Sequence, residues 1–93
     1  MILGALRVRL IIRQAKSLKD KRQVVLSMKD KLRNSFNVSV AETAHQDLWQ
    51  RAELTAAVVS TDRRHAESVL READQLVAGA DGARIVDTST SYL

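Results

Sequence analysis

Residues 2–36 decide the fold, because the spacing of their apolar side chains changes once within ILGALRVRLIIRQAKSLKDKRQVVLSMKDKLRNSF. Within residues 2–13 every second residue lies on the same face of an extended chain, and the residues of one face are apolar. This period of two predicts a half-buried strand. That face holds Leu6, Val8, Leu10 and Ile12. Farther along, apolar side chains recur every three or four positions, as on one side of a helix. This stripe holds Val25, Met28, Leu32 and Phe36.

The signals that bound this helix lie just outside the stripe. Ser17 and Asp20 have the spacing of a capping box, with Asp in place of the usual Glu, so we expect the helix to begin after Ser17. Asn34, Ser35 and Asn37 are expected to end it.

A strand and a turn are expected next. Over residues 38–45, Val38 and Val40 face inward, and the pattern predicts a second strand. Glu42 also falls on the inward side, so either the strand has left the core there or a bulge shifts its phase. Residues 46–50 are expected to form a turn.

The second half of the chain predicts a strand, a helix and a weaker last strand. Residues 51–60 alternate and form the third strand. Thr61 or Asp62 is expected to cap a second helix, which Gly79 ends. A fourth strand is expected over residues 83–89, with residues 89–93 frayed.

The order of these elements predicts one α+β domain over residues 1–93 with the ferredoxin-like βαββαβ fold. Its four-stranded sheet is antiparallel, with strand order 4-1-3-2, and both helices cover one face. In this topology the first helix begins beside the turn at 46–50, and the loop at 79–82 reaches the same end. The expected core comprises Leu6, Val8, Leu10, Val25, Met28, Leu32, Leu54, Ala56, Val58, Val69, Ala73 and Leu76.

Composition narrows the class of protein. Hydrophobic residues make up 45% of the chain and charged residues 28%, which suits a globular rather than a disordered protein. No apolar run reaches the ~18 residues of a membrane span, and the N-terminus lacks a signal-peptide layout. The absence of cysteine excludes disulfides and thiolate metal sites. We therefore expect a cytoplasmic protein with no membrane contact, no metal and no cofactor.

Charge is distributed very unevenly along the chain. Residues 7–33 carry ten basic and two acidic side chains, whereas residues 34–93 carry five basic and nine acidic ones. The overall net charge of +4 hides this difference. Such asymmetry favours an anionic partner for the basic region, most often a nucleic acid.

The start of the first helix is the leading candidate site. A helix N-terminus carries about half a positive charge and free backbone N–H groups, so acidic side chains would be more stable there. The sequence instead places Lys16, Lys19, Lys21 and Arg22 at this point, shortly after Arg13. Lys and Arg together with free N–H groups form a natural phosphate site. The alternative is a solvated cationic surface, which the neutralising charge of Asp20 favours.

Four blocks of this sequence resemble the YlxP-like family of small bacterial proteins. They are SLKDKR at 17–22, LRN at 32–34, FNVSVAE at 36–42 and DLWQRA at 47–52. The resemblance extends over residues 2–89, because the blocks occur in the family's order and spacing. It implies a ferredoxin-like fold and a gene located among those for transcription elongation, translation initiation and small-subunit maturation. The family has no settled activity or catalytic residues, and residues 89–93 have no counterpart in its pattern.

The turn at 46–50 is the second candidate, since it holds the one tryptophan. Trp49, with His45 nearby, can stack on a base or fill a partner's pocket. Alternatively, Trp49 folds back and covers the core.

The sheet face opposite the helices is the third candidate. It carries no aromatic side chain, which disfavours the base-stacking mode of ferredoxin-like RNA binders. Ile11, Ala57 and Val59 are apolar residues of this face, and they predict a homodimer through it or through an edge strand. The alternative is an ordinary solvated sheet.

Catalytic signatures are absent. His45 and His65 fall at opposite ends of the predicted fold, and no HxxxH, acidic cluster, Gly-rich phosphate loop or nucleophile elbow occurs. Arg63, Arg64 and His65 are interpreted as an ordinary charged first turn of the second helix. We therefore expect a non-enzymatic binding protein associated with RNA or the ribosomal small subunit. The alternative is a structural or regulatory homo-oligomer that binds a small anion or a protein partner.

Overall fold

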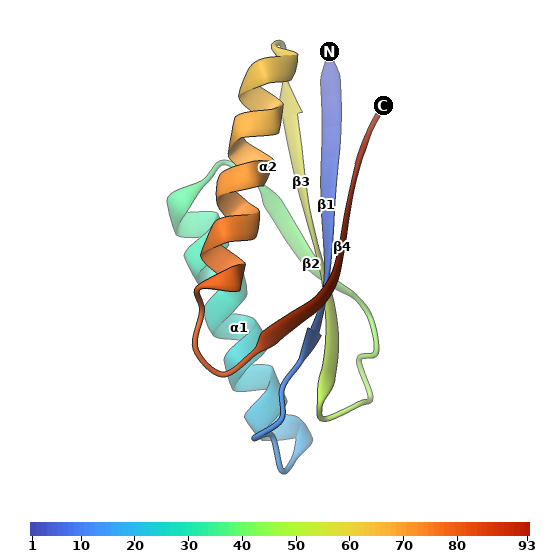
Figure 1. The fold of residues 1–93 in the computed structure, drawn as a ribbon, viewed down its shortest axis with the longest axis vertical. Coiled ribbons are helices and arrows are strands. Elements are labelled where there is room, and N and C mark those ends of the chain that lie inside the picture. The colour runs from blue at the N-terminus through green and yellow to red at the C-terminus, as the bar shows by residue number, and fades with distance from the viewer.

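The computed structural model describes residues 1–93 and confirms the ferredoxin-like sandwich (Figure 1). The elements are β1 (Ile2–Ile11), α1 (Leu18–Ser35), β2 (Ser39–Ala44), β3 (Arg51–Ser60), α2 (Arg63–Ala78) and β4 (Arg84–Tyr92). The sheet is antiparallel with order β2-β3-β1-β4, which is the predicted order counted from the other edge. Both helices lie on one face, and α1 begins at the end opposite the two chain termini (Figure 1).

The helix boundaries follow from their caps. Ser17 Oγ accepts the Asp20 N–H at 3.1 Å, while an Asp20 carboxylate oxygen accepts the Lys16 N–H at 3.0 Å. Asp20 thus accepts the N–H of the residue before the cap, whereas the Glu of a capping box accepts the N–H of the cap residue itself. For α2, Asp62 rather than Thr61 is the cap, and its carboxylate accepts the Arg64 N–H at 2.9 Å.

The core lies between the helices and the sheet and contains 18 buried apolar residues. Every predicted core residue is among them except Leu76, which is partly buried and packs against the cluster. Burial follows the two periods seen in the sequence, because the inward side of β1 and one stripe of each helix face the same layer.

The structure corrects the prediction for the C-terminus. β4 runs through Tyr92, and Leu93 donates its N–H to the Leu3 carbonyl at 2.8 Å, so residues 89–93 do not fray. The Tyr92 ring explains this order. It packs so close to Gly4 that a Cβ there would lie 2.9 Å from it, and the Arg63 guanidinium lies 3.9 Å from the ring centre.

The edge strand β2 is shorter than predicted and contains a bulge. Glu42 pairs with Leu54 and Ala44 with Glu53, which leaves Thr43 as the extra residue. Glu42 therefore keeps its inward orientation, and the phase shift comes directly after it. None of the helices is long and apolar enough to cross a lipid bilayer.

Candidate functional site

The start of α1 and the loop of residues 45–50 lie together at one end of the molecule, as predicted (Figure 1). Lys21 Nζ donates to the His45 carbonyl at 2.6 Å. Gln50 Nε2 donates to the Arg13 carbonyl at 3.2 Å. Two segments that are distant in sequence thus share one surface.

Four cations surround this point, and we call them the helix-start cluster: Arg13, Lys16, Lys19 and Arg22. All four are exposed, and none forms an ion pair within 4.0 Å. Lys19 and Arg22 lie one turn apart on α1 and share a face of the helix. Because Ser17 caps only the Asp20 N–H, the N–H groups of Leu18 and Lys19 have no partner in the chain. The cluster therefore offers unneutralised charge and directed donors together.

Lys21 does not belong to this cluster, and its prediction as a phosphate ligand is wrong. Its side chain is 1% exposed, and Nζ lies 2.6 Å from a Glu42 carboxylate oxygen and 2.6 Å from the His45 carbonyl. The contact with Glu42 is an ion pair and does not have the angles of a hydrogen bond. An ammonium enclosed by these two groups is not available to an external phosphate.

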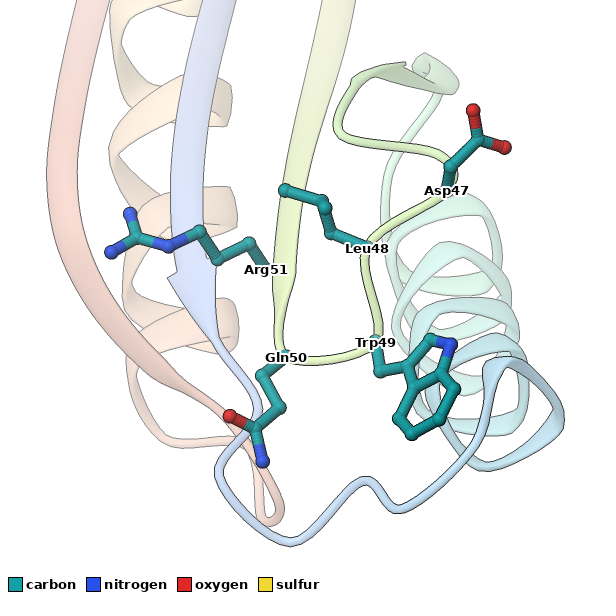
Figure 2. Close-up of a pocket in the computed structure, with 5 residues that line it drawn as sticks. All are labelled: Asp47, Leu48, Trp49, Gln50 and Arg51. Atoms are coloured by element: carbon teal, nitrogen blue, oxygen red, sulfur yellow. The ribbon is translucent and has the colours of Figure 1, made fainter.

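Trp49 stands beside the start of α1 and does not cover the core. The residue is 53% exposed, and it is absent from the core and from the apolar residues packed against it. Figure 2 shows the ring on the side of the loop where α1 begins, whereas Arg51 points the other way, across β1. Residues 47–51 line a shallow open concavity around it.

His45 contributes through its backbone more than through its ring. The residue has a φ of 62°, the left-handed conformation that is uncommon outside glycine. Its side chain is exposed and forms no hydrogen bond, while its carbonyl accepts both the Lys21 ammonium and the Leu48 N–H, the latter at 3.1 Å. The predicted proximity of His45 to the helix start is confirmed, but the carbonyl rather than the ring makes the contact.

The helix-free sheet face holds a second charged region, built around Glu53. The Glu53 side chain is 7% exposed, and its carboxylate accepts Thr43 Oγ1 at 2.7 Å and Arg9 Nε at 3.2 Å, with Arg7 Nε at 3.5 Å. The Thr43 hydroxyl and these two guanidiniums outweigh desolvation and lower the pKa of Glu53 below its usual 4.5. Because the Thr43 hydroxyl donates its hydrogen to Glu53, the Thr55 hydroxyl is the donor in the 2.8 Å contact between Thr43 and Thr55.

This network divides the predicted dimer surface. Val59 is 65% exposed at one end of the face, and Ala57 beside it is partly buried. Ile11 is partly buried at the other end of β1. The polar centre around Glu53 separates Ile11 from Ala57 and Val59, so the three residues do not form one continuous apolar patch.

At the start of α2, at the opposite end of the molecule, Arg63 is paired within the chain. Arg63 Nε lies 3.0 Å from Glu67, and its guanidinium covers the Tyr92 ring. His65 lies in this turn, and Figure 1 shows the start of α2 far from the loop between β2 and β3, which holds His45. No three His, Cys, Asp or Glu side chains are grouped so that they could hold a metal ion.

The Lys21–Glu42 pair was missed at the sequence level, although both residues carried a signal. Lys21 lies four residues before Val25, on the buried stripe of α1 that continues to Met28. Glu42 lies on the inward side of its strand. A cation on a buried helix stripe and a carboxylate on a buried strand face together predict an ion pair, because a lone buried charge is unstable.

Comparison with known proteins places the chain in a family. "Uncharacterized protein YlxP" of Bacillus subtilis (strain 168) is 43% identical over 61 residues, which are 66% of this chain and 66% of that protein, just under two thirds. A crystallised "dimeric ferredoxin-like protein of unknown function" from Thermobifida fusca YX covers 98% of this chain and 90% of its own, with a TM-score of 0.43 and 13% identity. A family model described as "Protein of unknown function (DUF503)" matches residues 3–90. The resemblance to YlxP-like proteins is thereby confirmed, and the chain belongs to this DUF503 family.

Proposed function

We propose that this chain is a non-enzymatic, cytoplasmic RNA-binding protein whose helix-start cluster contacts RNA phosphates. One observation carries the proposal: four exposed, unpaired cations surround a helix N-terminus beside a half-exposed tryptophan. Three other cations of the basic region are paired with carboxylates: Arg7 with Glu53, Arg9 with Glu53 and Asp87, and Lys21 with Glu42. Positive charge is therefore available at this end of the molecule for an external anion.

The physical character of the cluster favours a polyanion. Flexible Lys and Arg side chains contact phosphates without selecting a base sequence, and each contact releases a condensed counterion. Binding should therefore tolerate changes in sequence and weaken steeply with salt. Association with the ribosomal small subunit is supported by the gene neighbourhood that the resemblance to YlxP-like proteins implies.

The proposal is tested by reversing two charges. Lys19→Glu with Arg22→Glu is expected to weaken binding to an RNA oligomer, or to ribosomal subunits in co-sedimentation. It should also flatten the plot of log affinity against log salt by about 1.4, since each lost contact to a single strand contributes ~0.7. The melting temperature should not fall, because both side chains are exposed and a negative charge at a helix N-terminus is stabilising.

A matched control separates local contacts from net charge. Arg64→Glu with Arg71→Glu makes the same charge change on α2, where both side chains are exposed and form no ion pair. This variant should keep most of the affinity and the wild-type slope. Equal losses in the two double variants would mean that only overall charge matters, and wild-type binding by the Lys19/Arg22 variant would reject the site.

Self-association is the second candidate, and the exposure of Val59 favours it. In this alternative the chain is a structural or regulatory homodimer that binds a small anion or a protein partner. Sedimentation at micromolar concentration is expected to show a dimer that Val59→Asp disrupts. Leu26→Asp, at an exposed position of α1 on the opposite side of the sheet, is the control. A wild-type monomer that Val59→Asp leaves unchanged would exclude this interface.

A further inference from the structure

We infer that the site takes single-stranded RNA by stacking one base on Trp49, and that the buried Lys21–Glu42 pair is the device that positions Trp49 for this contact. The inference rests on the proposed RNA-binding function and adds to it a class of RNA and a positioning residue. It begins from the unexpected burial of Lys21, the one cation of the helix start that cannot reach a phosphate.

Lys21 is attached to the loop at its turning point. The His45 carbonyl accepts the Leu48 N–H at 3.1 Å, which closes the turn directly before Trp49. The same carbonyl accepts Lys21 Nζ at 2.6 Å, so both of its lone pairs are used. The ammonium thus joins the turn to the first helical residues of α1, where Lys19 and Arg22 stand.

Two further features show that the loop is held rather than free. His45 has a left-handed φ of 62°, a conformation that persists in a non-glycine residue only where its surroundings stabilise it. On the far side of Trp49, Gln50 Nε2 donates to the Arg13 and Ala15 carbonyls at 3.2 and 3.4 Å. Trp49 therefore lies between two attachment points, one on each side of it in sequence, and both lead to the start of α1.

The combination of a held aromatic ring and nearby cations selects single strands. A base can stack on a side chain only after it leaves the stack of a duplex, and a single strand offers such bases at little cost. Trp49 is 53% exposed, whereas the two other aromatic residues, Phe36 and Tyr92, pack against the core. Lys19 and Arg22 belong to the first turns of α1. Figure 2 shows the Trp49 ring on the side of the loop where α1 begins, so we infer that these cations contact the phosphates next to the stacked base.

The decisive variant is Lys21→Met with Glu42→Gln. It leaves the net charge unchanged and leaves no buried charge without a partner, so the fold should persist. It also retains Trp49 and every residue of the helix-start cluster. Trp49→Ala is the companion variant that removes the ring itself. Affinities are measured for one mixed-sequence RNA oligomer, as a single strand and as a duplex, and acrylamide quenching reports on the one tryptophan.

The wild type is expected to bind the single strand more tightly than the duplex, by about 5- to 150-fold, the range that one base-stacking aromatic supplies. Both variants should lose most of this preference, while the salt dependence stays unchanged because the phosphate contacts remain. In the Lys21→Met/Glu42→Gln variant Trp49 should become more accessible to acrylamide. Quenching is measured well below the melting transition of the variant, where a general loss of stability leaves the folded population unchanged, so the change reports on the position of Trp49.

Three other results would each reject one part of this inference. Equal wild-type affinity for the two RNA forms rejects the stacking of a base, although phosphate binding would stand. Wild-type quenching and preference in the Lys21→Met/Glu42→Gln variant reject the positioning role. If the wild type binds neither RNA form, the proposed function fails together with the choice of single strands, and the quenching comparison alone then decides whether Lys21 holds Trp49.

Discussion

The helix-free sheet face and the start of α1 are both basic in the sequence, yet they differ in the folded protein. On the sheet, Arg7 and Arg9 are opposed by Glu53, which β3 places directly across from Arg9. At the start of α1, Lys19 and Arg22 have no acidic partner within 4.0 Å. A run of basic residues in the sequence therefore does not by itself predict a positively charged surface. Strands that follow in the sequence place carboxylates beside some of these cations and not beside others.

Substitution of Lys21 tests this difference most directly. Lys21 belongs to the start of α1, but like Arg7 and Arg9 on the sheet it is paired with a glutamate. Lys21→Met leaves Glu42 without its cation and should lower the free energy of unfolding by about 3 kcal/mol. This is the lower end of the range for a broken buried pair, because the Glu42 side chain is 18% exposed. Urea denaturation measures the loss.

Lys19→Met is the matched control for this prediction, as the same substitution two residues earlier. It should change the free energy of unfolding by no more than about 0.5 kcal/mol, since Lys19 is exposed and unpaired. Similar values for the two variants would remove the distinction between paired and free cations.

A smaller effect is expected at the sheet face and depends on pH. The folded-state pKa of Glu53 lies below its unfolded value of 4.5, so its stabilising contribution is complete above that pH and is lost as pH falls through the folded pKa. Glu53→Gln should cost about 1–2 kcal/mol at pH 7 and flatten the acid side of the stability profile. Urea denaturation between pH 7 and pH 3 checks both. An unchanged acid limb in the variant would show that the Glu53 network does not couple folding to protonation.

The smallest effects should have opposite signs in the two regions. Lys19→Glu puts a negative charge at a helix N-terminus and should stabilise the fold by about 0.3–1 kcal/mol at low salt. Arg9→Glu places a carboxylate directly across from Glu53 and close to Asp87. This substitution should destabilise the fold by roughly 1 kcal/mol. Melting curves at low and high salt reveal the signs. Destabilisation by Lys19→Glu would mean that the helix start is already neutralised, which would also weaken the case for a phosphate site.

Local order was well predicted from the sequence where a period and a cap agree. β3 and the caps of α1 and α2 lie where the pattern places them, because alternation, helical stripes and Ser or Asp caps are properties of neighbouring residues. β4 is the exception. Its last residues are held by Gly4, Arg63 and the Leu3 carbonyl, which belong to β1 and α2, and no property of residues 89–93 themselves records those contacts.

The candidate site shows the same division. Its location at the α1 start, beside the loop that holds Trp49, follows from topology, and topology follows from the order of elements. The exposure of Trp49 and the capture of Lys21 did not follow, because each depends on the path of a short loop across another element. The bulge at Thr43 and the left-handed conformation of His45 determine the path of this loop. The position of the loop relative to α1 is visible only in the folded protein.

The sequence by itself thus determined the fold, the core and the end of the molecule at which the basic helix start lies. These depend on hydrophobic period and element order, which a linear chain displays. Only the tertiary structure decided which cations remain free, since that depends on carboxylates that are distant in sequence and near in space. Glu42 and Glu53 reach Lys21 and Arg9 through strand pairing and helix packing, and the Coulomb energy between two charges depends on the separation that folding creates.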